Sequence, residues 1–370
     1  MNIKKSPTLA VNWFLVLGLS MGIFLSACQT SQSQPTPNPS QVSGLQSEKV
    51  GAENAVVFSL DSGNLSPITS YIEHSKSNLD CEIHEISSTT ILKSIKSAVD
   101  RRVKVRFIQP EISGQTSLTS LGVQVKNLSN IDNLGAKACV QDLGTTAQNV
   151  LISTSDWKDF YPTGYKGYAV QLQGLSYASN QIAAQIEADL NGTTSPLVPK
   201  VSASPQTTKK TTPTPLVSAS PVAQPSTQKA EQGVTPPELL GVVSPYNSQT
   251  YLEWFLSTSS HTVILGNGRF SPELLQRLST NPNGGNYQMV LNNAPSLLLN
   301  SKLKCASRGE FYPTILFGFD STGKLQKAFL GSQSLDTNSL YQNREIGITL
   351  GPIAAQKLLD LVKPGLTGCL

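Results

Sequence analysis

The chain has 370 residues, with 28 Lys and Arg, 24 Asp and Glu, three His and five Cys. Only 14% of the residues are charged, against about 25% in an average protein. This composition excludes a charge-rich disordered chain, a coiled coil and a highly charged nucleic-acid-binding tail. Five cysteines are too few for a small fold held together by disulfides, and the length has room for about two domains.

The first 28 residues predict export and lipid anchoring. Lys4 and Lys5 precede an apolar run over residues 9–25, and small residues follow just before Cys28. This order is typical of a secretory signal and closely resembles the bacterial lipoprotein type. The resemblance implies cleavage of residues 1–27 and attachment of acyl chains, palmitate among them, to Cys28, which anchors the exported protein to a membrane of the bacterial cell envelope. The alternative is an uncleaved N-terminal membrane anchor.

Two segments rich in Ser, Thr and Pro divide the rest of the chain. Residues 28–54 predict a flexible spacer and residues 196–234 a linker, because such segments bury too little apolar surface to offset the entropy of ordering them. They delimit a first domain over residues 55–195 and a second over 235–370. Without the signal and linker lysines the folded parts are close to neutral, so the sequence gives no strong indication of a nucleic-acid partner.

Strand and helix patterns alternate in the first domain. The patterns predict helices over residues 67–75, over 182–190 and from a cap at Ser88 or Thr89 through Ala98. Gly122 is a helix stop. Predicted strands cover residues 55–59, 79–86, 103–108, 123–125, 136–141, 149–154 and 168–172.

The second domain repeats this order. Helices are predicted over residues 251–256 and 354–362 and from Pro272 onward. Predicted strands cover residues 241–245, 262–265, 288–291, 327–330 and 346–350. The alternation predicts an α/β fold with largely parallel or mixed sheets, and its repetition predicts an internal duplication.

The order of these segments resembles the phospholipase D superfamily. The matching stretches are residues 80–86, 98–107, 121–125, 136–142 and 152–157, and in the second domain 329–335 and 343–348. The resemblance implies two α/β units, with mixed sheets flanked by helices, packed as a pseudo-dimer around one shared site. It also implies phosphodiester transfer by a His-x-Lys-x₄-Asp motif in each half. One His attacks phosphorus, the other protonates the leaving oxygen, and the Lys pair with a downstream Asn or Ser stabilises charge.

Both motifs are degenerate in this chain. The first half has Gly135, Lys137 and Asp142 at the motif spacing, and the second half has Pro313, Ile315 and Asp320. Neither Gly nor Pro supplies an imidazole, and loss of a catalytic nucleophile removes many orders of magnitude in rate. In the downstream Gly-Ser-x-Asn motif, Asp156 places a carboxylate where it would repel a phosphate. These changes favour a catalytically silent descendant.

The three histidines have simple structural interpretations. His74 and His261 are expected at exposed turns or strand ends, and His84 is expected as a half-buried strand residue. The alternative for His84 is that it borders the cleft and acts as a nucleophile. Three tyrosines and one tryptophan are expected near the cleft of the first domain. We expect these side chains to pack in the core and loops, and the alternative is that they stack on a ligand. These residues are Trp157, Tyr161, Tyr165 and Tyr168.

The remaining cysteines form an even set in an exported protein, so two disulfides are predicted. The set consists of Cys81, Cys139, Cys305 and Cys369, and three pairings are open. Pairing Cys81 with Cys139 and Cys305 with Cys369 is the simplest because each pair stays within one domain. The spacing does not match a metal site, and no metal or cofactor is predicted.

Two function classes remain open. The first is a membrane-anchored, non-catalytic binding or scaffold module for a phosphate-containing or anionic ligand. The second is a divergent phosphodiesterase, of phospholipase D or nuclease type, acting on phospholipid or nucleic acid. Candidate ligand contacts are Lys137, Thr154, Ser332, Ser334 and Arg344.

Overall fold

The computed structural model describes residues 55–60, 64–110, 118–128, 133–162, 164–193, 241–280, 286–291, 303–306 and 313–366. All of them belong to one compact unit of the chain. The predicted signal, the spacer, the linker and Cys28 lie outside this part. Within it, none of the helices combines the length and apolar character needed to span a bilayer.

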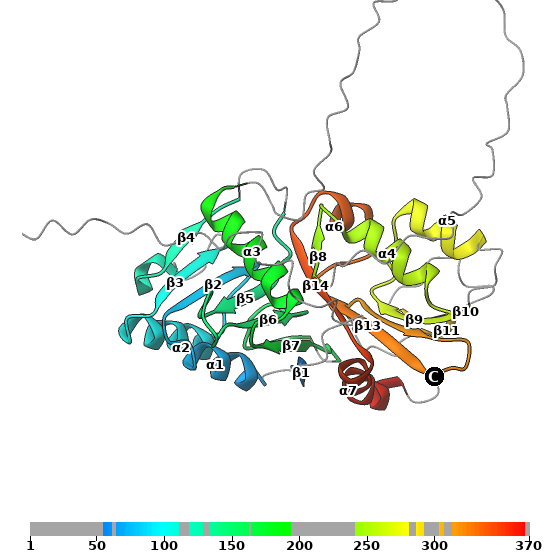
Figure 1. Ribbon diagram of the computed structural model, residues 1–370, viewed down its shortest axis with the longest axis horizontal. Coiled ribbons are helices and arrows are strands. Elements are labelled where there is room, and N and C mark those ends of the chain that lie inside the picture. Colours follow the sequence, from blue (N-terminus) through cyan, green and yellow to red (C-terminus); the bar gives the residue numbers. More distant parts are fainter. Residues whose placement is uncertain are drawn as a thin grey trace, which may run out of the picture. The chain divides into compact units, whose positions relative to one another are not determined.

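The first half forms a mixed seven-stranded sheet (Figure 1), in the order β1-β7-β6-β5-β2-β3-β4. Its helices are α1 (Ser66–Glu73), α2 (Thr89–Asp100) and α3 (Tyr177–Asn191), with a 3₁₀ turn, η2, at Leu118–Leu121. The strands are β1 (Ala55–Ser59), β2 (Asn78–Ile83), β3 (Lys104–Ile108), β4 (Gln124–Lys126), β5 (Lys137–Gln141), β6 (Asn149–Ser153) and β7 (Tyr168–Gln173).

The second half repeats this sheet with the same strand order, β8-β14-β13-β12-β9-β10-β11. Its helices are α4 (Ser248–Ser257), α5 (Pro272–Thr280), α6 (Thr337–Tyr341) and α7 (Pro352–Val362), with a 3₁₀ turn, η4, at Lys363–Leu366. The strands are β8 (Gly241–Ser244), β9 (His261–Gly266), β10 (Asn286–Leu291), β11 (Leu303–Ala306), β12 (Ile315–Phe319), β13 (Leu325–Gly331) and β14 (Glu345–Leu350).

The two halves also share the same strand directions. In each half the first four strands pair antiparallel, the fourth also pairs antiparallel with the fifth, and the last three run parallel. The predicted mixed α/β fold with an internal duplication is therefore confirmed.

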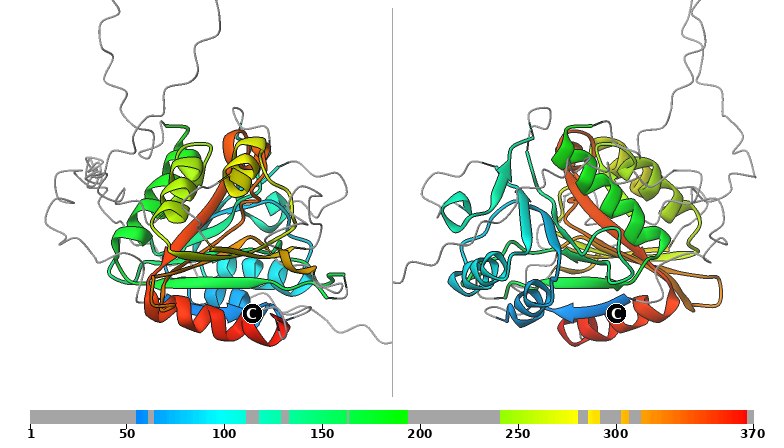
Figure 2. Two further views of the ribbon diagram at one scale, coloured as in Figure 1. Left: turned by 90° about the vertical axis from the view of Figure 1, so that its right-hand side faces the viewer. Right: turned by 60° about the vertical axis from the view of Figure 1, so that its left-hand side comes forward.

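The two halves share one apolar core. Side chains of both sheets and of α3 and α7 meet in a single cluster, which includes Val170, Ile186, Ile315, Ile348 and Leu358. Figure 2 shows α7 (red) beside β1 (blue), so the last helix of one half packs on the first strand of the other. The two halves are therefore joined by a shared apolar interface.

The other face of each sheet has its own core. In the first half α1 and α2 bury Ile68, Tyr71, Ile91 and Ile95. Paired strands β2 and β5 carry a disulfide between Cys81 and Cys139, with 4.0 Å between their Cα atoms. This is one of the pairings left open by the sequence. The side chain of Cys305 and all of Cys369 lie outside the described part of the chain.

Arg344 connects the halves through backbone and side chain. Its carbonyl oxygen accepts hydrogen bonds from the amides of Gly135 and Ala136, each at 2.8 Å. Its guanidinium is 1% exposed and donates to Asp189 Oδ1 at 2.9 Å and to the Ser244 carbonyl at 2.9 Å. The expectation that Arg344 contacts a ligand is thus corrected, because its charge is buried and bound to the first half.

Candidate functional site

The two motif aspartates fix turns. Asp142 follows β5 with a φ of 54°, and its Oδ1 accepts hydrogen bonds from the amides of Lys76 at 2.9 Å and Ser77 at 2.7 Å. Asp320 follows β12, and its Oδ1 accepts from the amides of Thr322 at 2.9 Å and Lys324 at 3.0 Å. Hydrogen bonds from Thr322 and Lys324 lower the pKa of Asp320 to about 2. Both carboxylates are thus bound by backbone amides of neighbouring segments.

The space beside Gly135 is filled by a carboxylate from the other half. A Cβ atom placed on Gly135 would lie 2.2 Å from Oε1 of Glu345, the first residue of β14. Glu345 is buried, and burial raises its pKa to about 7 although the Lys137 ammonium and the hydroxyls of Ser332 and Ser339 oppose the shift. A histidine at position 135 therefore does not fit this packing, and Glu345 stands where its side chain would begin.

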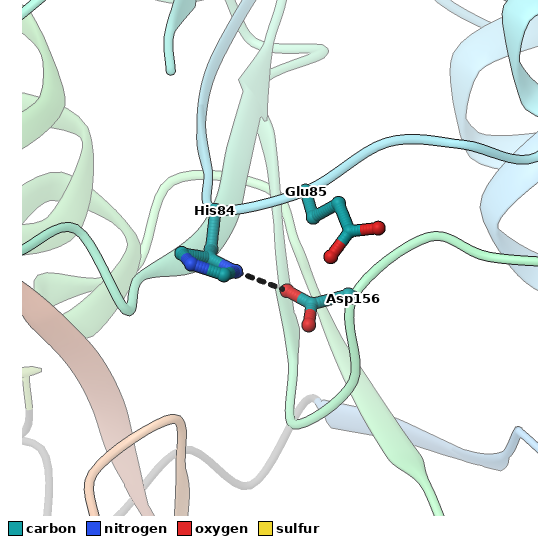
Figure 3. A group of neighbouring side chains, drawn as sticks. All are labelled: His84, Glu85 and Asp156. Atoms are coloured by element: carbon teal, nitrogen blue, oxygen red, sulfur yellow. Dashed lines mark hydrogen bonds and ion pairs between the residues drawn. The ribbon is translucent and has the colours of Figure 1, made fainter. Parts of the chain in front are cut away.

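Lys137 and His84 converge on Asp156. The Lys137 ammonium donates to the Gly135 carbonyl at 2.7 Å and lies 3.7 Å from Asp156 Oδ1. His84 Nδ1 lies 3.3 Å from the same oxygen (Figure 3). Burial raises the pKa of Asp156, but the His84 hydrogen bond and the charges of Lys137 and Lys158 outweigh it, so the net shift is downward. Asp156 is therefore ionised at neutral pH.

Glu85 completes this cluster. Ligand atoms of His84, Glu85 and Asp156 lie within 4.8 Å of one another, a spacing that a divalent cation can use. However, Lys158 forms ion pairs with Glu85 and Asp156, and Lys137 is a second ammonium beside Asp156. Because two ammonium groups already compensate the two carboxylates, the cluster fits an ion-pair network better than a metal site.

The cavity beside this network has a volume of about 420 Å³ and lies between the halves. The segment after β6 contributes one wall and the segments before β12 and after β13 contribute the other. The lining residues are Thr154, Asp156, Lys158, Phe160, Tyr161, Pro162 and Tyr165 from the first half, and Asn267, Pro313, Thr314, Ser332, Gln333 and Ser334 from the second.

Three of the predicted ligand contacts, Thr154, Ser332 and Ser334, line this cavity. Lys137 is connected to it through Asp156. Of the degenerate motif positions Pro313 lines the cavity, whereas Ile315 is fully buried in the core.

The sequence did not predict two features of the site. One is Glu345 against Gly135, and the other is His84 bound to Asp156. His84 is half-buried, as expected, and lies just beyond the end of β2; it contacts Asp156, which lines the cavity, but is not itself a lining residue. Of the other histidines, His74 is exposed and bonds within α1, while His261 packs against Phe319, so neither belongs to the cavity.

The cavity also has an aromatic wall. Tyr161 and Tyr165 stack with ring centroids 4.6 Å apart and an interplanar angle of 11°. Burial raises the pKa of both phenols, so they stay neutral at physiological pH. Phe160, the next residue along, is 89% exposed. The expectation that packing accounts for this cluster holds for Trp157, which is fully buried, but Tyr161 and Tyr165 face the cavity.

Comparison with solved structures gives matches that share this architecture. Polyphosphate kinase from Porphyromonas gingivalis superposes with a TM-score of 0.61 and 10% identity, over 85% of this chain and 47% of that one. Phosphatidylserine synthase from Haemophilus influenzae superposes with a TM-score of 0.54 and 11% identity, over 86% of each chain. Both are members of the phospholipase D superfamily. This chain has the phospholipase D fold.

The likeness to these structures concerns the fold. The chain spans about half the length of the polyphosphate kinase, and identities of 10–11% say nothing of substrate. No family profile matches the chain, and no curated protein matches it in sequence. The likeness therefore shows the fold, and the residues around the cavity must indicate the function.

Proposed function

We propose that the protein is a catalytically silent, phospholipase D-like binding module, exported and anchored to a bacterial membrane through Cys28. The single observation that carries this proposal is Gly135 packed against Glu345, since the position of the motif nucleophile has neither an imidazole nor room for one. At the second motif, Pro313 lines the cavity and likewise lacks a titratable group. The cavity remains, so the protein retains a place for a ligand.

The charged side chains around the cavity limit the net charge of the ligand that it can bind. The sequence predicts a phosphate-containing or anionic ligand, and Lys158 is the ammonium group on the cavity wall. Both Lys137 and Lys158 are paired with carboxylates, and Asp156 faces the cavity as well. Because these charges nearly cancel, a ligand with a single negative charge, such as a phosphodiester, fits better than a polyanion.

Isothermal titration calorimetry of the full chain with diglycerol phosphate, a phosphodiester of charge −1, tests the proposal. We expect saturable binding, several-fold weaker binding to Lys158→Ala, and no cleavage of the diester by phosphorus NMR. Lys96→Ala, which removes an exposed lysine of α2 paired with Asp100, is the matched control and should bind like the parent. Cleavage of the diester, or tighter binding of inorganic polyphosphate, would contradict the proposal.

One observation favours a second candidate, a divergent phosphodiesterase. His84 shares Asp156 with Lys137, so an imidazole and an ammonium group lie close together although neither motif histidine is present. An imidazole held by a carboxylate is a competent base or nucleophile. Turnover that disappears in His84→Ala and in Lys137→Ala would establish this candidate, on phospholipid or on nucleic acid.

A further inference from the structure

We propose that the cavity between the halves binds a saccharide ring, which stacks on the Tyr161–Tyr165 pair while its hydroxyl groups bond to the polar wall opposite. This inference rests on the proposed binding function and names the chemistry that the ligand presents. It applies equally to a neutral glycan and to a sugar within a phosphodiester, because both offer the same ring.

The tyrosine pair is a preformed stacking surface. Offset parallel rings 4.6 Å apart hold each other in one orientation, so little side-chain entropy is lost when a ligand binds. One face of a pyranose presents C–H groups, which pack against the electron-rich face of an aromatic ring. Phe160 adds a third ring at the edge of the cavity, exposed to solvent by 89% and without a core to pack into.

The opposite wall has the polarity that sugar hydroxyls require. Asn267, Thr314, Ser332, Gln333 and Ser334 line it, and all five carry neutral groups. Ser332, Gln333 and Ser334 already donate hydrogen bonds within the protein, to Ile346, Val242 and Asp336. Hydroxyl oxygens also accept hydrogen bonds, so a sugar hydroxyl would donate to the serine oxygens of this wall. Asp156 adds an ionised acceptor at the same cavity. A volume of about 420 Å³ lies in the range of small-molecule sites.

The charge pattern separates a saccharide from a nucleotide. A nucleobase also stacks on aromatic rings, but a nucleotide such as ATP brings several negative charges, which need more free positive charge than the single charge of a phosphodiester does. Lys158 lies on the cavity wall but is bound to Glu85 and Asp156, and Lys137 lies beside Asp156. Arg344 is buried at the junction of the halves. A stacking surface next to neutral donors and acceptors, with its lysines already paired, therefore matches a sugar.

Calorimetric titration of the full chain with tetra-N-acetylchitotetraose, in a detergent without a sugar headgroup, tests this inference. We expect saturable binding of this neutral tetrasaccharide. Tyr165→Ala should weaken it by about tenfold, whereas Tyr165→Phe, which keeps the ring, should bind within about twofold of the parent. Phe160→Ala, an exposed position that the fold does not need, should weaken binding by about threefold and serves as the second variant if Tyr165→Ala unfolds.

Two further ligands separate the possible failures. If diglycerol phosphate binds and the tetrasaccharide does not, the saccharide inference is wrong while the binding module stands. If the tetrasaccharide binds equally to the parent, Tyr165→Ala and Phe160→Ala, the aromatic wall is not its site and the inference is again wrong. If diglycerol phosphate, the tetrasaccharide and ATP all fail to bind, the proposed binding function and the saccharide inference are both wrong. Preference for ATP over the tetrasaccharide would assign the aromatic wall to a nucleobase.

Discussion

Glu345 is a buried carboxylate packed against Gly135, with Lys137 and Asp336 as its charged neighbours. Burial is the largest cause of its raised pKa, and the Lys137 charge opposes that shift. A carboxyl group with these surroundings stays largely protonated just below neutral pH. The charge beside Gly135 and Lys137 therefore depends on whether Glu345 is protonated. Because folding changes the pKa of Glu345, the free energy of unfolding depends on pH.

The pKa of Glu345 predicts how stability depends on pH. In the folded chain the pKa is about 7, against an ordinary value of 4.5, so the folded state binds this proton more tightly. The protonated Glu345 side chain therefore adds at most about 3 kcal/mol to the free energy of unfolding. This contribution is fully present below pH 4.5 and is lost as the pH rises through 7. Urea unfolding should show this decline in the parent and a flatter profile in Glu345→Gln. Equal slopes for the two proteins over this range would refute the assignment.

Gly135 is predicted to be intolerant of any side chain. Gly135→Ala places a Cβ against Glu345 and should lower the free energy of unfolding by about 1–3 kcal/mol. The penalty should shrink by about 1 kcal/mol or more in a Glu345→Ala background, because the clashing atoms are then gone. Gly266→Ala, where the nearest atom is 3.7 Å away, is the control and should be nearly neutral. An additive double variant would show that the two positions do not compete for space.

Among the elements, paired strands β2 and β5 carry both the disulfide and the first motif. The Cys81–Cys139 bond closes a loop with a sequence separation of 58 residues. Replacing both cysteines by alanine should cost about 2–4 kcal/mol, because the unfolded chain regains the freedom of that loop. Thermal unfolding with and without reductant measures it. Reductant should lower the melting temperature of the parent and leave the double variant unchanged, and a parent insensitive to reductant would count against the bond.

Most elements could be predicted because their periodicity is local. Alternating or apolar runs give the strands of the first half, and Ser88 caps α2 through a hydrogen bond from the Ile91 amide, as expected. Strand β12 was missed because Ile315–Phe319 is a short apolar run without alternation. Strand β11 and helix α6 were also missed, because elements of four and five residues are too short to show a hydrophobic period. Helix α3 begins earlier than predicted, because its capping box uses Ser179 rather than an acidic residue or Gln.

The site was harder to predict because it depends on contacts between distant segments. The motif spacing identified Gly135, Lys137 and Asp142 from local sequence. Nothing local indicates that Glu345 lies against Gly135, since that contact exists only when the halves pack together. The His84–Asp156 contact likewise joins residues 72 positions apart. The sequence therefore identified the positions with motif spacing, and the packing of the halves decides which groups surround them.

At the scale of the whole molecule, Arg344 is a buried cation between two halves that meet mainly through apolar side chains. Arg344 bonds directly to Asp189 of α3, and its Nε lies 3.8 Å from Oε2 of Glu82 in β2. Burial raises the pKa of Glu82, so Asp189 is the charged partner of Arg344. Arg344→Met leaves Asp189 buried without its cation and should cost about 3–5 kcal/mol in unfolding free energy. Adding Asp189→Asn to Arg344→Met should recover part of that loss, because no unpaired carboxylate then stays buried at this position.

Exposed Arg269→Met is the control for this link and should change stability by no more than about 0.5 kcal/mol. Urea unfolding of the four proteins measures the effect, and gel filtration after cleavage of the predicted linker reports whether the two halves stay associated. If Arg344→Met is as stable as the control, the buried ion pair does not join the halves.

The most direct test of catalytic silence is a turnover assay on the full chain. A panel of bis-p-nitrophenyl phosphate, phosphatidylcholine and single-stranded DNA covers the substrate classes of the alternative function. We predict no product above the buffer rate for any of them, and the same result for His84→Ala and Lys137→Ala. Product formation by the parent that is lost in His84→Ala would contradict a silent centre and assign catalysis to the imidazole bound to Asp156.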